Sequence, residues 1–175
     1  MPSPMPKKAS RVTLILFVLT ISVLALSIPS SLKEAYHRGG FYVFSQSFIE
    51  DIPKRLSGPG RFRFILQPLL ATIIGIRSGI ADARSGRPPY IYGVLFNRKS
   101  RGELLKSGFS SIVNLLLMGI LLDSLFQWLI LGASYPGAAL LVGPVLIAMP
   151  YSIARALANR SARLRGGSSA SWLHF

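Results

Sequence analysis

Hydrophobic residues along this chain are gathered into four long runs separated by polar segments. The runs cover residues 12–28, 62–80, 109–131 and 138–154, and the second starts near Phe62 or Phe64. A helix needs roughly 20 predominantly apolar residues to cross the hydrocarbon core of a bilayer. The pattern therefore predicts an all-α, multi-pass transmembrane protein with about four spans.

The first run, "VTLILFVLTISVLALSI", has two interpretations. Its basic start and the small residues Ala25 and Ser27 are typical of a secretory signal cleaved after Ser27, which would leave three spans. The apolar run is longer than the ~7 to 15 residues of a usual signal peptide. This length favours an uncleaved signal anchor formed by residues 1–30.

Residues 31–60 comprise a linker and a shorter amphipathic segment. In "FYVFSQSFIEDIPKRL" (41–56), helical spacing places aromatic and aliphatic side chains on one face and most charged side chains off it. The segment is too charged to span a membrane, and Pro53 is expected to bend it. It predicts a helix lying in the membrane interface, or alternatively a helix packed against the transmembrane bundle.

Residues 61–155 are expected to form the transmembrane core, with a basic loop at 84–106. Within that loop "YIYGVLF" is too short to cross a bilayer, so we expect it to lie in the interface or to pack on the bundle. Ser100 and Glu103 have the spacing of a capping box that starts the next helix. Residues 156–175, rich in Arg, Gly and Ser, are expected to form a disordered tail.

The distribution of charge predicts an orientation. The chain has 175 residues and a net charge of +14. Lys and Arg number three before the first run, six in residues 84–106 and four from Arg155 onward, against five in residues 29–61 and none in residues 132–137. Because basic residues collect on the cytoplasmic side, both termini and the basic loop are predicted to be cytoplasmic. Basic residues placed beside apolar runs indicate anionic lipid headgroups rather than nucleic acid as their partner.

Composition also restricts the chemistry that we expect. The sequence has no cysteine and two histidines, His37 and His174, in separate polar segments, so disulfides, thiolate metal sites and a conventional zinc site are not expected. The sequence pattern indicates no paired carboxylates at a common depth, no Ser/His/Asp set and no glycine-rich phosphate loop. We therefore expect no cofactor and no enzymatic activity.

The stretch "GIRSGIADARSGRPP" (75–89) extends the second run into a polar segment. At about 100° per residue, small side chains form a ridge along one side of this helix. Small residues let helix backbones approach closely in lipid, so the ridge predicts a contact with another helix. Asp82 lies close to this ridge, whose members are Ala71, Gly75, Gly79 and Ala83.

Arg77 and Arg84 lie on roughly the opposite face, and two interpretations are open for them. In the first they mark the cytoplasmic membrane boundary, because an arginine near a helix end extends its charge to the headgroups. In the second they join the following loop in binding an anionic headgroup or a ligand phosphate, which planar guanidinium groups suit. The residues of this predicted site are Arg77, Arg84, Arg87, Arg98, Lys99 and Arg101.

Asp123 is the one carboxylate inside the four predicted spans, with Gln127 one turn further on the same face and Asn114 nearly opposite. A charge at the bilayer centre costs roughly 2.5 to 3.5 kcal/mol on insertion scales, so a compensating interaction is expected. The structural interpretation is a hydroxyl partner such as Tyr135 or Ser152, or a route to the outer surface. The functional alternative is a proton or cation site.

The most distinctive pieces of residues 48–131 are "GPGRFR", "QP", "DARSGRPP" and "RGELL". On these pieces the chain resembles a functionally uncharacterised family of small bacterial multi-pass inner-membrane proteins. The resemblance implies a bacterial inner-membrane setting. It transfers no functional residues, because no activity is attached to that family.

Together these patterns favour a structural or accessory membrane subunit that packs with partner helices and engages anionic lipid. Its partners would be further copies of the chain or a larger membrane complex. The alternative is a small oligomeric transport component that uses Asp123 as its coupling group. A lipid-modifying enzyme is a third hypothesis, disfavoured because the sequence shows no nucleophile or metal site.

Overall fold

The computed structural model describes residues 10–58 and 60–170, and every regular element in this part of the chain is helical. The predicted all-α fold is confirmed. Four helices are long and apolar enough to cross a membrane, over Arg11–His37, Arg63–Arg84, Arg98–Leu131 and Pro136–Arg165. The elements in chain order are α1 (Arg11–Arg38), η1 (Tyr42–Phe44), α2 (Gln46–Glu50), α3 (Ile52–Ser57), α4 (Arg63–Arg84), α5 (Tyr90–Phe96), α6 (Arg98–Leu131) and α7 (Pro136–Ala170).

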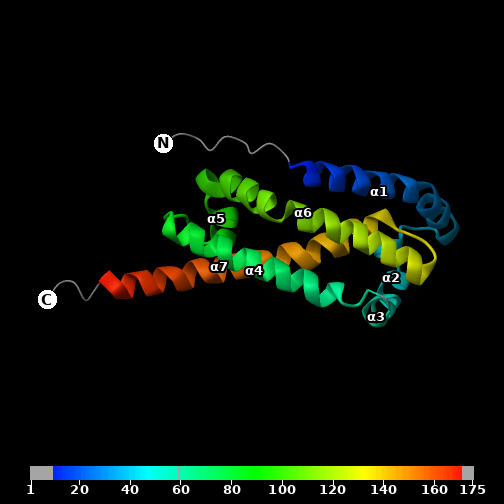
Figure 1. Ribbon diagram of the computed structural model, residues 1–175. Helices are drawn as coiled ribbons and strands as arrows, with labels where there is room; N and C mark the ends of the chain where they lie inside the picture. Colours follow the sequence, from blue (N-terminus) through cyan, green and yellow to red (C-terminus); the bar gives the residue numbers. More distant parts are fainter. Residues whose placement is uncertain (1–9, 59, 171–175) are drawn as a thin grey trace.

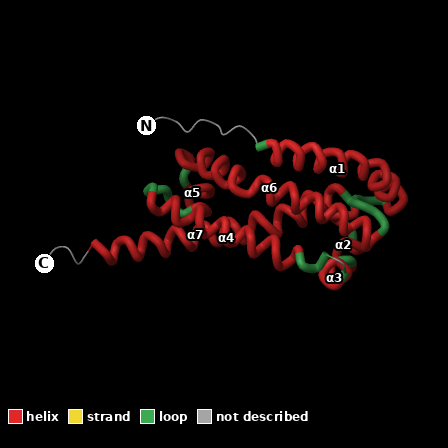
Figure 2. Tube along the Cα trace, viewed as in Figure 1, coloured by secondary structure: helices red, strands yellow, loops and turns green. Residues whose placement is uncertain are grey.

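The four long helices form one elongated bundle in which α1 packs along α6 and α4 packs along α7 (Figure 1). Contacts between α6 and α7 join the two pairs. α5 and the C-terminal part of α7 lie toward one end, and α2 and α3 lie at the other, with short connections between the helices (Figure 2). We call the first the basic end (residues 84–106 and 156–165) and the second the α3 end (residues 39–62 and 132–135).

The small ridge of α4 faces α7 of the same chain. A Cβ atom on Gly75 would lie 2.6 Å from the carbonyl oxygen of Tyr151, and a Cβ atom on Gly79 would overlap the carbonyl oxygen of Arg155. Ala71 is fully buried in the same region. Only glycine permits this approach of the two backbones, so the ridge is occupied by a helix of this chain.

α6 touches helices on two sides. Toward α7, a Cβ atom on Gly143 would lie 3.0 Å from backbone atoms of Gly119 and Ile120, which marks a second close crossing. Toward α1, the Thr13 hydroxyl donates to Asn114 Oδ1 at 2.8 Å. Asn114 therefore contacts α1 through its side-chain oxygen, on a different side of α6 from Asp123.

The helix boundaries near the basic end differ from those predicted. α6 starts at Arg98 and is capped by Asn97, whose Oδ1 accepts the N–H groups of Lys99 at 3.1 Å and Ser100 at 3.4 Å. The predicted cap at Ser100 is therefore wrong. Residues 90–96 form α5, so much of the predicted loop at 84–106 is helical.

Two terminal segments also differ. α1 continues through Pro29 to Arg38, into the predicted linker. α7 continues to Ala170, so residues 156–170 of the predicted disordered tail at 156–175 are helical, and alanine and arginine supply strong helix formers as far as Arg165. Residues 1–9 and 171–175 lie outside the described residues.

The amphipathic segment at 41–56 is divided into η1, α2 and α3, with Pro53 in the first turn of α3, where a proline costs no hydrogen bond. Phe41 and Phe44 are exposed, while Tyr42 and Arg55 are buried against the bundle. The segment therefore packs on the transmembrane helices through Tyr42 and Arg55. Helical spacing places most charged side chains of this segment off its apolar face, whereas Arg55 is buried.

Candidate functional site

A buried ion pair at the basic end joins α4 to α7. Arg155 Nε donates to Asp82 Oδ2 at 2.6 Å, and Arg155 Nη2 donates to Asp82 Oδ1 at 3.0 Å. The same guanidinium donates to the Tyr151 hydroxyl at 2.7 Å and to Ser107 Oγ at 3.2 Å. Arg155 also lies over the Tyr90 ring, 4.4 Å from its centroid. We call these five residues the Arg155 cluster: Asp82, Tyr90, Ser107, Tyr151 and Arg155.

The Arg155 cluster is buried and closed. Arg155 is 1% exposed and Asp82 is 2% exposed, and each nitrogen of the guanidinium group has an acceptor. A buried ion pair tolerates its desolvation only when geometry and hydrogen bonds are this complete. Burial raises the pKa of Tyr90 above its ordinary value of 10.0, although Arg155 opposes the shift. The cluster therefore holds α4, α5, α6 and α7 together through one buried cation and one buried anion.

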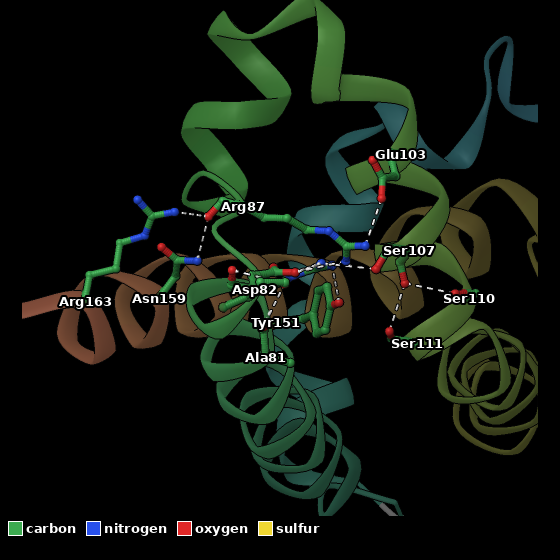
Figure 3. Close-up of polar contacts among 12 residues, drawn as sticks. Ala81, Asp82, Arg87, Glu103, Ser107, Ser110, Ser111, Tyr151, Asn159 and Arg163 are labelled. Atoms are coloured by element: carbon green, nitrogen blue, oxygen red, sulfur yellow. Dashed lines mark hydrogen bonds and ion pairs between the residues drawn. The ribbon is translucent and has the colours of Figure 1, made fainter. Parts of the chain in front are cut away.

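Arg87 extends these contacts into the loop after α4. Its Nη1 lies 3.5 Å from Asp82 Oδ1, and its Nη2 donates to Glu103 at 2.8 Å. Figure 3 shows this side chain extending from Asp82 toward Glu103, while Asn159 and Arg163 approach the Arg87 carbonyl. Asn159 Nδ2 donates to that oxygen at 3.2 Å, and Arg163 Nη2 donates to it as well. Arg87 is thus a structural connector between α4, α6 and α7.

A second buried cluster surrounds Asp123 near the α3 end. Arg63 Nη1 lies 2.5 Å from Asp123 Oδ1, and Arg55 Nη1 lies 3.4 Å from both carboxylate oxygens. Gln127 Nε2 donates to Asp123 Oδ2 at 2.5 Å. We call these four residues the Asp123 cluster: Arg55, Arg63, Asp123 and Gln127.

The expected partners of Asp123 were wrong. Neither the Tyr135 hydroxyl nor Ser152 contacts the carboxylate; the Tyr135 hydroxyl donates to Glu34 at 2.8 Å. Tyr135 contributes through its backbone N–H, which donates to Gln127 Oε1 at 2.8 Å. Arg63, in the first turn of α4, is 5% exposed because Asp123 supplies a buried counterion.

Tyr42 connects the Asp123 cluster to the surface of the α3 end. Its ring stacks on Tyr135 with centroids 3.8 Å apart, and its hydroxyl accepts from Arg55 Nη2 at 3.4 Å and donates to Asp51 Oδ2 at 2.7 Å. Burial raises the pKa of Tyr42 to about 12, with Arg55 opposing the shift. Burial also raises the pKa of Asp51, but hydrogen bonds from Lys54 and Tyr42 outweigh it and hold that pKa below 3.8.

Several polar atoms near this cluster lack a hydrogen-bond partner among the described residues. They are buried, as is Asp123, which is fully inaccessible. Buried polar atoms without a protein partner are the places where ordered water is found in proteins. The unpartnered atoms on helices α3, α4 and α6 are Arg55 Nε, Arg63 Nη2, Gln67 Nε2, Gln67 Oε1 and Ser124 Oγ.

The predicted basic site is distributed over several elements. Arg77 and Arg84 are exposed along α4, and Arg98, Lys99 and Arg101 are exposed in the first turns of α6. Among the residues that the structure describes, none of these five forms an ion pair. Arg87 is the exception, because it is half-buried and bound to Asp82 and Glu103.

The sequence missed Arg55, Arg63 and Arg155 as partners of the membrane carboxylates. The signal available was indirect: a buried Asp requires a cation, and Arg63 and Arg155 lie at the edges of predicted spans. Sequence spacing does not reveal which cation approaches which carboxylate, because the pairs are 60 and 73 residues apart. Within the described residues, no group of three His, Asp or Glu side chains is placed to hold a metal ion.

Comparison with known proteins adds nothing to the assignment of a function. No protein-family model, curated protein or solved structure matches this chain. The resemblance of residues 48–131 to bacterial inner-membrane proteins therefore stays a prediction from the sequence.

Proposed function

We propose that this protein is a non-enzymatic structural or accessory subunit of the bacterial inner membrane, whose basic end engages anionic lipid on the cytoplasmic side. The observation that carries the proposal is the uneven distribution of exposed positive charge. Exposed basic residues of the basic end are Arg84, Arg98, Lys99, Arg101, Lys106, Arg160, Arg163 and Arg165, whereas those of the α3 end are Lys54 and Arg61, to which the adjoining end of α1 adds Lys33.

Burial sharpens the orientation that the sequence predicts. Arg55 was counted among the basic residues of the segment between the first two spans, but its charge is buried against Asp123. The α3 end therefore presents less positive charge than its composition implies. A charge asymmetry of this kind favours a cytoplasmic basic end.

The membrane carboxylates support a structural role. Asp82 is bound by Arg155 and so joins α4 to α7, and Asp123 is bound by Arg63 and Arg55 and so joins α6 to α4 and α3. The small ridge of α4 is filled by α7, and association with partner helices would therefore use other lipid-facing surfaces. α1 offers one such surface, because most of its apolar side chains are exposed.

Orientation can be tested directly because the chain has no cysteine of its own. Ser85→Cys lies at the basic end and Ser57→Cys at the α3 end, and both serines are exposed. A membrane-impermeant maleimide should label Ser85→Cys in inverted inner-membrane vesicles and Ser57→Cys in right-side-out vesicles. The reverse labelling pattern would contradict the proposed orientation.

The lipid preference has its own test. We expect the protein to unfold at a higher temperature in phosphatidylglycerol nanodiscs than in phosphatidylcholine nanodiscs. The triple variant Arg98→Gln, Lys99→Gln, Arg101→Gln should reduce this difference, since each basic residue near an anionic surface contributes about 1 kcal/mol. Equal unfolding temperatures of the wild type in both lipids would rule out engagement of anionic lipid. Native mass spectrometry of the same samples reports whether the subunit forms oligomers.

A transport component is the second candidate, favoured by the unpartnered polar atoms around Asp123. In that case Asp123 would exchange a proton or cation through water held in this buried polar region. Proteoliposome flux of protons and monovalent cations should then fall in Asp123→Asn. Equal flux in wild type and variant removes Asp123 from any transport mechanism.

A further inference from the structure

A groove of about 1010 Å³ follows the outer side of the α4–α7 contact and runs into the basic end. Over most of its length the walls are apolar, with Ile76 and Ile80 on α4 and Ile153 and Leu157 on α7. Small α7 residues form the floor of the groove and leave it open: Ala154, Ala158 and Ala162. Since α4 and α7 are candidate membrane spans, the apolar part of this groove faces lipid.

The groove becomes positively charged where it reaches the basic end. Arg84 of α4 and Arg163 and Arg165 of α7 line it there, and no Asp or Glu is among its lining residues. Arg163 donates through Nη2 to the Arg87 carbonyl, which fixes its side chain beside the loop after α4.

The apolar surface of α7 extends to the level of these arginines. Leu157 is 58% exposed and Leu164 is 77% exposed, and Leu164 lies between Arg163 and Arg165 in the chain. Exposed leucines at this level indicate contact with lipid rather than water. The three guanidinium groups therefore lie where the headgroups of a surrounding monolayer would meet them, and guanidinium groups bind phosphate oxygens in a planar fork.

We infer that this groove binds one anionic phospholipid, with its phosphate between Arg84, Arg163 and Arg165 and one acyl chain along the apolar part. The inference rests on the proposed function for the cytoplasmic placement of the basic end. It goes further in assigning the lipid to one defined site, whose residues differ from those predicted from the sequence. Of the basic residues predicted from the sequence, only Arg84 belongs to it. From Thr72 to Arg84 the α4 wall is about 18 Å long, which accommodates an extended chain.

The test uses the full chain purified in a mild detergent and titrated with phosphatidylglycerol or phosphatidylcholine, with bound lipid counted by native mass spectrometry. We expect one retained phosphatidylglycerol and no retained phosphatidylcholine. Arg84→Gln, Arg163→Gln, Arg165→Gln should weaken retention by roughly 100-fold. The control Lys33→Gln, Lys54→Gln, Arg61→Gln removes the same charge from exposed residues at the other end of the bundle, and should retain the lipid.

A second variant tests the groove without altering charge. Ala162→Leu would fill the groove near the arginines and should weaken retention by about tenfold. Because Ala162 lies outside the two buried clusters, this variant keeps the inference testable even if the triple groove variant fails to fold. Glycerol phosphate added in excess should not displace the lipid, because it lacks the acyl chain; displacement would identify a site for free phosphate and overturn the lipid assignment.

Failure of this inference and failure of the proposed function give different results. If wild type prefers phosphatidylglycerol nanodiscs but Ala162→Leu and the groove triple variant retain lipid as wild type does, the groove is not the site while the function stands. Equal loss of retained lipid in the groove and control triple variants also overturns the groove. If wild type neither retains phosphatidylglycerol nor prefers it in nanodiscs, both proposals fail.

Discussion

The two buried charge clusters each neutralise a buried carboxylate, but with different numbers of arginines. In the Arg155 cluster the Arg155 guanidinium forms a bidentate pair with Asp82 and also donates to Tyr151 and Ser107. In the Asp123 cluster two guanidinium groups share one carboxylate, and Arg55 Nε and Arg63 Nη2 have no hydrogen-bond partner among the described residues. The first is electrically balanced, and the second carries an excess buried positive charge.

This difference shows what each cluster holds together. The Arg155 cluster joins four helices of the bundle, so it fixes helices that already lie side by side. The Asp123 cluster reaches through Arg55 into α3, which has few other contacts with the bundle, and so attaches the segment between α1 and α4. We therefore expect the Arg155 cluster to control global stability and Arg55 to control the local attachment of the α3 end.

The largest effect is expected at the balanced pair. Asp82→Leu should lower the free energy of unfolding by roughly 3 to 5 kcal/mol, because it leaves Arg155 buried without a counterion. The measurement is unfolding by dodecyl sulfate in mixed micelles. The double variant Asp82→Leu, Arg155→Met should recover most of that loss, because it removes both charges. A double variant as unstable as the single one would show that the penalty does not come from an unpaired charge.

The two arginines of the Asp123 cluster should differ from each other. Arg63→Gln is expected to cost about 3 kcal/mol, since Arg63 makes the short contact with Asp123, and Arg55→Gln about 1 kcal/mol, since Arg63 still neutralises the carboxylate. Arg55→Gln should instead increase hydrogen exchange in residues 42–57 while leaving α4 and α7 protected. Equal costs for the two variants would contradict the division of roles between them.

The close approach of α4 and α7 gives a way to disturb only the Arg155 cluster. Gly79→Ala should cost about 2 kcal/mol, because the added Cβ would meet the Arg155 carbonyl and push its side chain from Asp82. Gly102→Ala is the matched control, since nothing lies within 4 Å of that position in α6, and it should be neutral or stabilising. Crosslinking between α3 and α6 should be unchanged in Gly79→Ala; a change there would indicate that the two clusters are coupled.

The smallest effect is a pH dependence confined to the α3 end. The pKa of Tyr42 is raised from 10.0 to about 12, so its contribution is complete below pH 10 and is lost as pH rises toward 12. We expect a loss on the order of 1 kcal/mol across this window, measured by unfolding at fixed detergent composition. Tyr42→Phe should abolish that part of the pH dependence. An unchanged pH profile in Tyr42→Phe would assign it to another group.

The sequence was informative where the physics is local. Apolar runs of membrane length gave the four long helices, and small residues at helical spacing marked the face of α4 that packs closely. It was less informative at segment ends: Asn97 rather than Ser100 caps α6, and α7 extends into the predicted tail as far as Ala170. Alternative helix ends differ from one another by small free energies, so contacts with neighbouring elements determine where a helix begins and ends.

The charged residues mark the limit of inference from the sequence. The sequence by itself determined that Asp123 lies within an apolar span and needs a compensating partner, because an unpaired charge at that depth in lipid is costly. The tertiary structure alone decided that Arg63 and Arg55 supply the compensation and that Arg155 binds Asp82. Pairing depends on which helices lie side by side, and for residues far apart in the chain that is settled by packing of the whole bundle.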